Sequence, residues 1–318
     1  MGDPASASPQ ALAASLSRLK GLARFVVIGD AGVYRKAEKI EKVPSRKACY
    51  DFLDLKNVPL STFSFGRPKA AYGRASLDYI DAALGLLRER RIDCLVTGPV
   101  SKEHVSAAGV KFSGHTEYLA GALGVRDYAM MLLNNKLKIT LVTRHIPLEK
   151  VSRALNAGAI RSAVISTHKW LKVLFAVRSP RIVVCGLNPH ASDNGLIGDN
   201  ENILIKPLVR SLRARGVRIE GPVSAEAALL KTAEGAYDAA IAMYHDQAMV
   251  ALKLSDASSG VNLTLGLPFV RTSPLHGTAF DIAGTKKVSP ASFTAAIETA
   301  AACSLRYARY RSSHARRS

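Results

Sequence analysis

The sequence predicts an α/β protein with two lobes, in which mainly parallel sheets are flanked by helices. Short, continuous apolar runs recur along the chain, as expected of strands that are covered on both faces. Segments with helical periodicity lie between these runs, and such alternation is typical of a mainly parallel sheet. The length of 318 residues fits a single two-lobed catalytic unit over residues 1–318, whose internal boundary the pattern does not locate.

Five apolar runs predict strands, and each of them leads into a turn or a helical pattern. They are residues 25–29, 93–99, 138–143, 181–186 and 238–244.

Three segments predict helices. Ser76 is expected to cap a helix that ends near Arg90 and Arg91, where positive side chains favour the negative end of the helix dipole. A second helix is expected over residues 201–215, ended by Gly216, and a third from Pro290 to about residue 307. The basic tail at residues 311–318 is expected to be disordered.

The composition excludes several classes of protein. Lys and Arg number 44 against 25 Asp and Glu, a formal net charge of +19, so the surface attracts anions. Aromatic residues are only 6% and no basic run is interleaved with them, so nucleic-acid binding is not predicted. No apolar stretch is long enough to span a membrane, and residues 1–10 do not resemble a secretory signal. Four scattered cysteines fit a reducing compartment, and we expect a cytoplasmic protein.

Three histidines share one context and predict a metal site. His145, His190 and His245 each follow the carboxyl end of a predicted strand. Ligands of open α/β sheets bind outside the carboxyl ends of the strands. Three imidazoles from separate strands can therefore converge on one divalent cation, and three protein ligands with an open position are typical of a catalytic metal.

An anion site is predicted beside these histidines. Lys253 follows His245 by eight residues and would lie on the same edge if the chain continues as a strand or loop. Asn262 and Arg271 follow at intervals of nine, and arginine binds carboxylate or phosphate with two parallel hydrogen bonds. No GxGxxG, GxxxxGK[ST], GxSxG or HExxH motif is present.

A series of motifs spans roughly residues 97–285. The motifs are Thr97-Gly-Pro-Val-Ser-Lys102, Gly114-His-Thr-Glu117, Gly186-Leu-Asn-Pro-His-Ala191, Met243-Tyr-His-Asp-Gln247, Thr264-Leu-Gly-Leu-Pro-Phe269, His276-Gly-Thr-Ala279 and Asp281-Ile-Ala-Gly284. In this order they resemble the 4-hydroxythreonine-4-phosphate dehydrogenase family of vitamin B6 biosynthesis.

The resemblance implies a fold like that of isocitrate and isopropylmalate dehydrogenases, and a homodimer with a shared active site. It implies His145, His190 and His245 as metal ligands, with His145 and His190 from one protomer and His245 from its partner. The implied substrate contacts are His115, Thr116, Lys253, Asn262 and Arg271.

The implied reaction oxidises the C3 hydroxyl of 4-phosphooxy-L-threonine and then decarboxylates the product to 3-amino-2-oxopropyl phosphate, in pyridoxal 5'-phosphate biosynthesis. The cofactors would be NAD, with NADP as the alternative, and one divalent ion chosen from Zn, Mg, Co and Mn; cofactor-binding residues are not assigned. Two other interpretations are a dehydrogenase of threonate or erythronate 4-phosphate in the same fold and an inactive homologue that binds metal or phosphate.

The chain departs from the family at its beginning. The family usually opens with a sequence like GDPAGIGPE, whereas this chain reads Gly2-Asp3-Pro4-Ala5-Ser-Ala-Ser-Pro9-Gln10. Two glycines and the acidic residue are therefore replaced, and glycines in such loops permit a close backbone approach.

Overall fold

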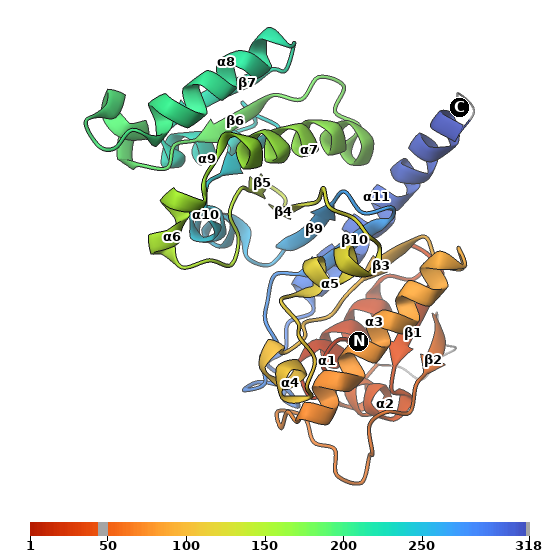
Figure 1. Ribbon diagram of the computed structural model, residues 1–318. Coiled ribbons are helices and arrows are strands. Elements are labelled where there is room, and N and C mark those ends of the chain that lie inside the picture. Colours follow the sequence, from red (N-terminus) through yellow and green to blue (C-terminus); the bar gives the residue numbers. More distant parts are fainter. Residues whose placement is uncertain (44–49, 316–318) are drawn as a thin grey trace. The chain divides into compact units, whose positions relative to one another are not determined.

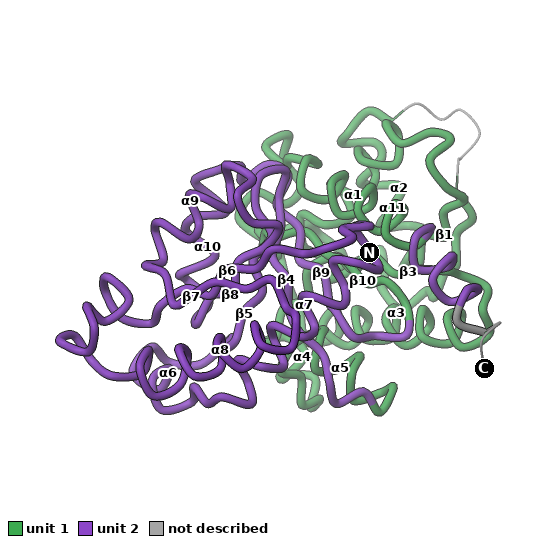
Figure 2. The backbone as a smooth tube through the Cα atoms, turned by 90° about the horizontal axis from the view of Figure 1, so that it is seen from above, with its two compact units in different colours: residues 1–124, 269–304 green, residues 125–268, 305–318 purple. Residues whose placement is uncertain are grey.

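The structure is a computed structural model that describes residues 1–43 and 50–315 (Figure 1). The chain forms two compact units (Figure 2). Unit 1 comprises residues 1–124 and 269–304, and unit 2 comprises residues 125–268 and 305–318. The boundary that the sequence pattern did not locate is therefore crossed three times, between residues 124 and 125, 268 and 269, and 304 and 305.

Unit 1 contains two pairs of parallel strands. β1 (Phe25–Gly29) pairs with β2 (Tyr50–Asp54), and β10 (Val270–Pro274) pairs with β3 (Cys94–Val96). The helices of this unit are α1 (Ser8–Arg18), α2 (Ala31–Ile40), α3 (Ala70–Arg88), α4 (Lys102–Ala107), α5 (His115–Ala122) and the first part of α11 (Ala291–Ala315).

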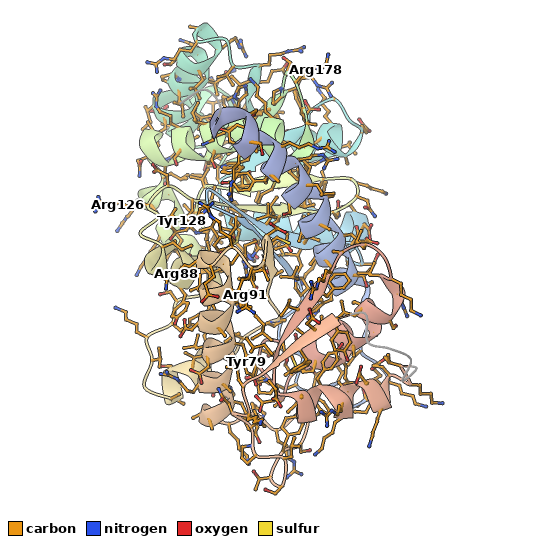
Figure 3. The ribbon with its side chains drawn as sticks, turned by 90° about the vertical axis from the view of Figure 1, so that its right-hand side faces the viewer. Tyr79, Arg88, Arg91, Arg126, Tyr128 and Arg178 are labelled. Carbon is orange, nitrogen blue, oxygen red and sulfur yellow. The ribbon has the colours of Figure 1, made fainter. Side chains whose placement is uncertain are left out.

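Helix α3 begins earlier than the sequence predicts. Ser76 lies inside the helix rather than at its cap, and it is buried. Its hydroxyl donates to the carbonyl of Gly73 at 2.6 Å, so the side chain is satisfied without leaving the helical conformation. The predicted end is confirmed, since Arg88 is the last helical residue and Arg91 follows it closely (Figure 3).

Gln10 shows why the acidic residue of the family's opening can be replaced. The side chain is completely buried in α1. Its amide group donates to the carboxylate of Glu41 and to the carbonyl of Thr285, both at 2.9 Å, and its oxygen accepts from the backbone N–H of Gly284 at 2.6 Å. A carboxylate could not donate these bonds and would lie against a second carboxylate, so this environment favours the amide.

Unit 2 is built on six strands in the order β9-β4-β5-β8-β6-β7. The strand bounds are β4 (Ala129–Leu133), β5 (Lys138–Leu141), β6 (Ile182–Cys185), β7 (Ile219–Val223), β8 (Ala239–Ala242) and β9 (Val261–Leu265). β5, β8, β6 and β7 are parallel, and β4 runs antiparallel to both of its neighbours. The predicted α/β fold with mainly parallel strands is confirmed.

The helices of unit 2 cover both faces of these strands. They are α6 (Leu148–Ala154), α7 (Ala157–Phe175), α8 (Lys206–Ala214), α9 (Ala225–Ala233) and α10 (His245–Asp256), with short helical turns at Pro189–Gly195 and Glu201–Ile205. Both α7 and α10 pack against β4, β5 and β8, which places them on opposite faces (Figure 1). This double covering explains why the strands read as continuous apolar runs.

The basic tail is helical where the structure describes it. Helix α11 continues to Ala315, so the predicted disorder is wrong for residues 311–315, while residues 316–318 lie outside the described part of the chain. Tyr307 packs on Trp170 with ring centroids 5.7 Å apart and stacks on Tyr310 at 6.3 Å. The Arg311 guanidinium lies 6.0 Å from the Tyr307 ring centroid. These aromatic and cation–π contacts, which composition does not reveal, extend the helix.

Although α11 is the longest helix in the described residues, neither it nor any other helix there is both long and apolar enough to cross a membrane.

Candidate active site

The three predicted metal ligands follow neighbouring strands of unit 2. β5, β8 and β6 are adjacent and parallel, so their carboxyl ends lie at one edge of the sheet. His145 follows the end of β5, His245 is the first residue of α10 after β8, and His190 lies in the turn after β6. The structure therefore places all three residues at the edge where α/β proteins bind ligands.

His145 and His245 form a pair that suits a divalent metal. Their ring centroids lie 5.5 Å apart. Two imidazoles bound to one tetrahedral zinc have centroids about 5 Å apart, given Zn–N distances of about 2.0–2.1 Å. Nδ1 of His245 lies 2.8 Å from a carboxylate oxygen of Asp246, which leaves Nε2 to bind a metal and orients the ring.

Both rings of this pair belong to the same chain. The resemblance implied that His245 comes from the partner protomer. Within one chain, the rings of His145 and His245 already lie close together, and the shared metal site stays a prediction.

His190 does not complete a set of three in the single chain. Among residues 1–43 and 50–315, no group of three or more His, Cys, Asp or Glu side chains is placed to hold a metal. Residues 190–194 are all in the left-handed region, with φ between 44° and 71°, and His190 is exposed on this turn. The left-handed path of this backbone turn decides where the His190 ring lies, and the spacing of the sequence does not predict that path.

Lys253 lies at the other edge of the sheet from His245. The prediction of a shared edge required a strand or loop, but the segment is helix α10, and eight residues of helix span about 12 Å. Asn134, which follows the carboxyl end of antiparallel β4, donates to the carbonyls of Leu252 and Asp256 at 3.0 and 3.1 Å. The last turn of α10 therefore lies at the amino ends of β5 and β8, and the predicted position of Lys253 is wrong for a single chain.

Asn262 lies within β9, opposite Leu132 of β4. Leu132 in turn pairs with Ile139, near the amino end of β5, so Asn262 is also displaced from the histidine edge. Its Oδ1 atom is buried and has no hydrogen-bond partner among the described residues. Such a buried acceptor is a group that a ligand could satisfy.

Unit 1 brings His115 and Arg271 together. Arg271, on β10, is 1% exposed, and its Nε and Nη2 atoms donate to the hydroxyl of Thr97 at 3.2 and 2.5 Å. Burial lowers the pKa of the Arg271 guanidinium to about 10, and the carboxylate of Glu117 opposes this shift. A cation held in such surroundings favours an anionic partner.

The imidazole of His115 is neutral at physiological pH. Burial, and secondarily the charge of Arg271, hold the pKa of His115 well below its usual range. The ring bonds to the backbone of Gly98, while Nε2 is buried with no hydrogen-bond partner in the described part of the chain. Thr116, the next residue of α5, is also buried. Three of the predicted substrate contacts are therefore in unit 1, and the charge of one of them, Arg271, acts on another, His115.

Four residues that the sequence interpretation did not assign support the candidate site residues in the two units. Thr97 and Glu117 contact or act on Arg271. In unit 2, Glu201 and Gln247 bond to the backbone around the histidine-bearing turns. Thr97, Glu117 and Gln247 belong to the quoted motifs, which was the one signal available for them; Glu201 lies outside every motif.

Asp3 is a second unusual group in unit 1. It is completely buried; Oδ1 accepts from the N–H of Ala5 at 2.9 Å, and Oδ2 has no hydrogen-bond partner among the described residues. Burial raises the pKa of Asp3 to about 6 from 3.8. The side chain therefore binds a proton more tightly in the folded state than in the unfolded state.

We expect Asp3→Asn to stabilise the protein at pH 8 more than at pH 4. The pKa of Asp3 is higher in the folded state than in the unfolded state. Its contribution to the free energy of unfolding is therefore complete below about pH 4 and is lost as the pH rises through about 6. Raising the pKa of Asp3 from 3.8 to about 6 corresponds to at most roughly 3 kcal/mol of unfolding free energy. Urea unfolding between pH 4 and pH 8 measures the difference, with the exposed Asp51→Asn as control. An advantage of Asp3→Asn that does not change with pH would contradict the prediction.

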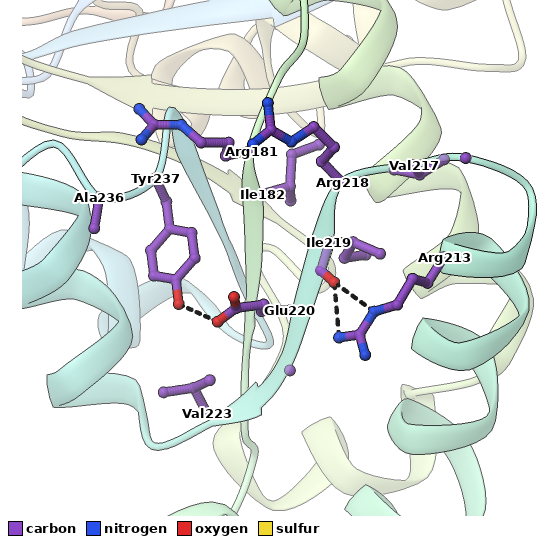
Figure 4. Close-up of a pocket in the computed structure, with 12 residues that line it drawn as sticks. Arg181, Ile182, Arg213, Val217, Arg218, Ile219, Glu220, Val223, Ala236 and Tyr237 are labelled. Atoms are coloured by element: carbon purple, nitrogen blue, oxygen red, sulfur yellow. Dashed lines mark hydrogen bonds between the residues drawn. The ribbon is translucent and has the colours of Figure 1, made fainter.

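A pocket of about 670 Å³ lies at the amino ends of β6 and β7 (Figure 4). The Arg213 guanidinium donates to the carbonyl of Ile219 at 3.2 and 3.0 Å, and the hydroxyl of Tyr237 donates to Glu220. Arg181 forms an ion pair with Asp238 at 3.0 Å. Because these polar groups bond to the protein itself, and because no predicted site residue lines this pocket, we place the candidate site at the histidine edge.

Comparison with known proteins identifies the family. The family model described as "Pyridoxal phosphate biosynthetic protein PdxA" matches residues 21–300. The 4-hydroxythreonine-4-phosphate dehydrogenase of Sulfurihydrogenibium sp. is 38% identical over 309 residues, covering 94% of this chain and 95% of the relative. The enzyme of the same name from Caulobacter vibrioides is 39% identical over 315 residues, covering 94% and 95%.

A solved structure gives the same result. The crystal structure of 4-hydroxythreonine-4-phosphate dehydrogenase from Klebsiella pneumoniae has a TM-score of 0.84 and 35% sequence identity. The match covers 96% of this chain and 98% of that one. Since the family model spans most of the chain and the relatives cover nearly all of it, this chain belongs to the PdxA family of pyridoxal phosphate biosynthetic proteins.

Proposed function

We propose that the protein is an NAD-dependent dehydrogenase of 4-phosphooxy-L-threonine. The overall reaction converts this substrate and NAD⁺ to 3-amino-2-oxopropyl phosphate, CO₂ and NADH. The observation that carries the proposal is the His145–His245 pair at the carboxyl edge of a mainly parallel sheet, in a chain of this family. The two relatives and the solved structure described above bear the name of this activity.

The imidazoles of unit 2 are the proposed metal ligands. His145 and His245 have the spacing that one divalent ion requires, and we assign His190 as the third ligand because its strand end lies at the same edge. When bound, the metal would supply Lewis-acid activation of the substrate hydroxyl and NAD would supply the hydride acceptor. Imidazole ligands suit Zn, Co or Mn, and Mg remains a candidate from the family.

The basic groups of unit 1 are proposed to bind the anionic substrate. Arg271 is held in place by its bonds to Thr97, and its buried positive charge favours a phosphate or carboxylate. His115, kept neutral by its surroundings, can accept a hydrogen bond from the substrate at Nε2. Thr116 supplies a hydroxyl beside it.

We further propose a homodimer in which the second copy completes the site. In the described part of a single chain, His190 forms no group of three potential metal ligands with the other histidines, and Lys253 and Asn262 lie away from the histidine edge. A site that uses all the residues implied by the family therefore needs contributions from two copies.

Mixing two variants that are each inactive, His145→Ala and Lys253→Ala, is expected to restore part of the activity if the sites are shared.

The direct test is NADH formation from 4-phosphooxy-L-threonine with and without a chelator. We expect turnover that the chelator abolishes and added Zn²⁺, Co²⁺ or Mn²⁺ restores. Parallel assays with threonate 4-phosphate, erythronate 4-phosphate and NADP⁺ separate the alternatives. Faster turnover of either sugar acid would replace the proposed substrate, and binding of NAD without turnover of any of the three would indicate an inactive homologue.

A further inference from the structure

A continuous series of hydrogen bonds joins the turns that carry the three histidines. Thr143 lies two residues before His145, and both its backbone N–H and its hydroxyl donate to the carbonyl of Met243, at 3.1 and 2.7 Å. Met243 lies two residues before His245. The ends of β5 and β8 are thus tied together immediately before their histidines.

Gln247 extends this series from β8 to β6. Its Oε1 atom accepts from the backbone N–H of Met243 at 2.7 Å, and its Nε2 atom donates to the carbonyl of Gly186 at 2.9 Å. Gly186 is the first residue after β6 and lies four residues before His190. One side-chain amide therefore bonds to both strand ends, two residues after His245 in the same turn of α10.

Glu201 holds the far end of the series. This carboxylate is completely buried, and it accepts from the backbone N–H groups of Leu187 and Asn188 at 2.8 and 2.7 Å. Its second oxygen accepts from the side-chain amide of Asn188 at 2.9 Å. Three donors to one buried carboxylate form strong, charge-assisted bonds. They fix the two residues that enter the left-handed turn of His190.

Gly186 has no room for a side chain at this junction. A Cβ atom there would lie 2.8 Å from Cα of Ala191 and 3.2 Å from a carboxylate oxygen of Glu201. The turn of His190 is therefore packed directly against the residues that Gln247 and Glu201 hold. A left-handed turn of five non-glycine residues costs about 1–2 kcal/mol per residue and persists only where neighbouring contacts determine it.

We propose that Gln247 and Glu201 are positioning residues that hold the turns carrying His245 and His190 in place and so tune the metal affinity of these imidazoles. This inference rests on the proposed function of the histidine edge as a metal site. Neither side chain contacts the metal in the proposal; each acts through the backbone that carries a ligand. Ligand rings whose supporting turns are held in place before binding give higher affinity than rings that must be ordered on binding.

The test is titration of the metal-free full-length protein with Co²⁺, followed by the visible absorption of the bound ion. Gln247→Met keeps the length of the side chain but removes both hydrogen bonds, and we expect it to raise the Co²⁺ Kd about tenfold or more, the range for outer-shell partners. The Co²⁺ absorption bands should also shift, because the ligand geometry changes. Glu201→Gln is expected to act in the same direction.

Asn134 provides a matched control for a purely structural role. Its side chain is buried, accepts from the N–H groups of Lys136 and Leu137, and donates to Leu252, but it does so at the amino edge of the same sheet. Asn134→Leu should lower Tm as Gln247→Met does, while leaving the Co²⁺ Kd and absorption bands unchanged. If Gln247→Met does not fold, Gln247→Glu replaces it in the test. This variant still accepts the hydrogen bond from the Met243 N–H but loses the donor to Gly186, so it should also raise the Co²⁺ Kd.

The outcomes distinguish the inference from the function on which it rests. A folded Gln247 variant with the Kd and spectrum of the unaltered protein would overturn the positioning role. Equal weakening by Asn134→Leu would do the same, because it would show a general effect of stability. If the unaltered protein takes up no Co²⁺, or if His145→Ala binds it equally well, the metal site itself is wrong.

Discussion

His145→Ala is expected to abolish metal-dependent turnover, lowering kcat/KM by more than about 100-fold. Loss of an outer-shell partner already costs 10–100-fold in metal affinity or activity, and a direct ligand contributes more. The substitution leaves His245 without the ring that lies 5.5 Å from its own. NADH formation at several metal concentrations is the measurement, with circular dichroism to show that the fold is retained.

His168→Ala is the control for this prediction, because His168 belongs to α7 of the same unit and lies outside the proposed site. It should retain full activity. His190→Ala tests the third ligand, and we expect it to lose metal-dependent turnover while leaving the fold intact. Full activity of His145→Ala with an unchanged metal requirement would remove the imidazole pair from the mechanism.

Arg271→Met is expected to raise KM roughly 30-fold or more. Truncating one partner of a buried, hydrogen-bonded charge pair costs about 2–5 kcal/mol of binding free energy. Methionine replaces much of the volume of the side chain, so the substitution removes the charge and the donors to Thr97 with a small cavity. Steady-state kinetics measure KM and kcat separately, and urea unfolding measures the accompanying loss of stability.

Two comparisons define the role of Arg271. Arg271→Lys retains the charge without the planar pair of donors and should give an intermediate KM. Arg306→Ala removes an arginine that bonds to the carbonyl of Leu174 in unit 2, and KM should not change. If Arg271→Met unfolds at lower urea but binds substrate with unaltered KM, the buried guanidinium has only a structural role.

The site could be predicted from sequence only where short segments determine the geometry. The apolar runs before His145, His190 and His245 gave strands, and parallel strands have their carboxyl ends at one edge. Lys253 was placed wrongly because the nine residues from His245 to Lys253 read equally well as loop or helix, and helix α10 takes the lysine to the opposite edge. The left-handed turn of His190 has no sequence signal, since its five residues are not glycines.

Residues that act over long sequence separations were not identified. Glu201 bonds to a turn 13 residues earlier, and Gln247 bonds to Gly186, which is 61 residues away. Arg271 and Thr97 are separated by 174 residues. No local pattern distinguishes such a glutamate or glutamine from one on a solvated helix face.

The sequence by itself determined the α/β class, the strands and the common edge of the three histidines, because hydrophobic periodicity and strand direction are local properties of the chain. The tertiary structure alone decided which imidazoles meet, which carboxylates and guanidinium are buried, and which side chains hold the turns. Those features depend on desolvation and on hydrogen bonds between distant segments, and both exist only after the strands have packed.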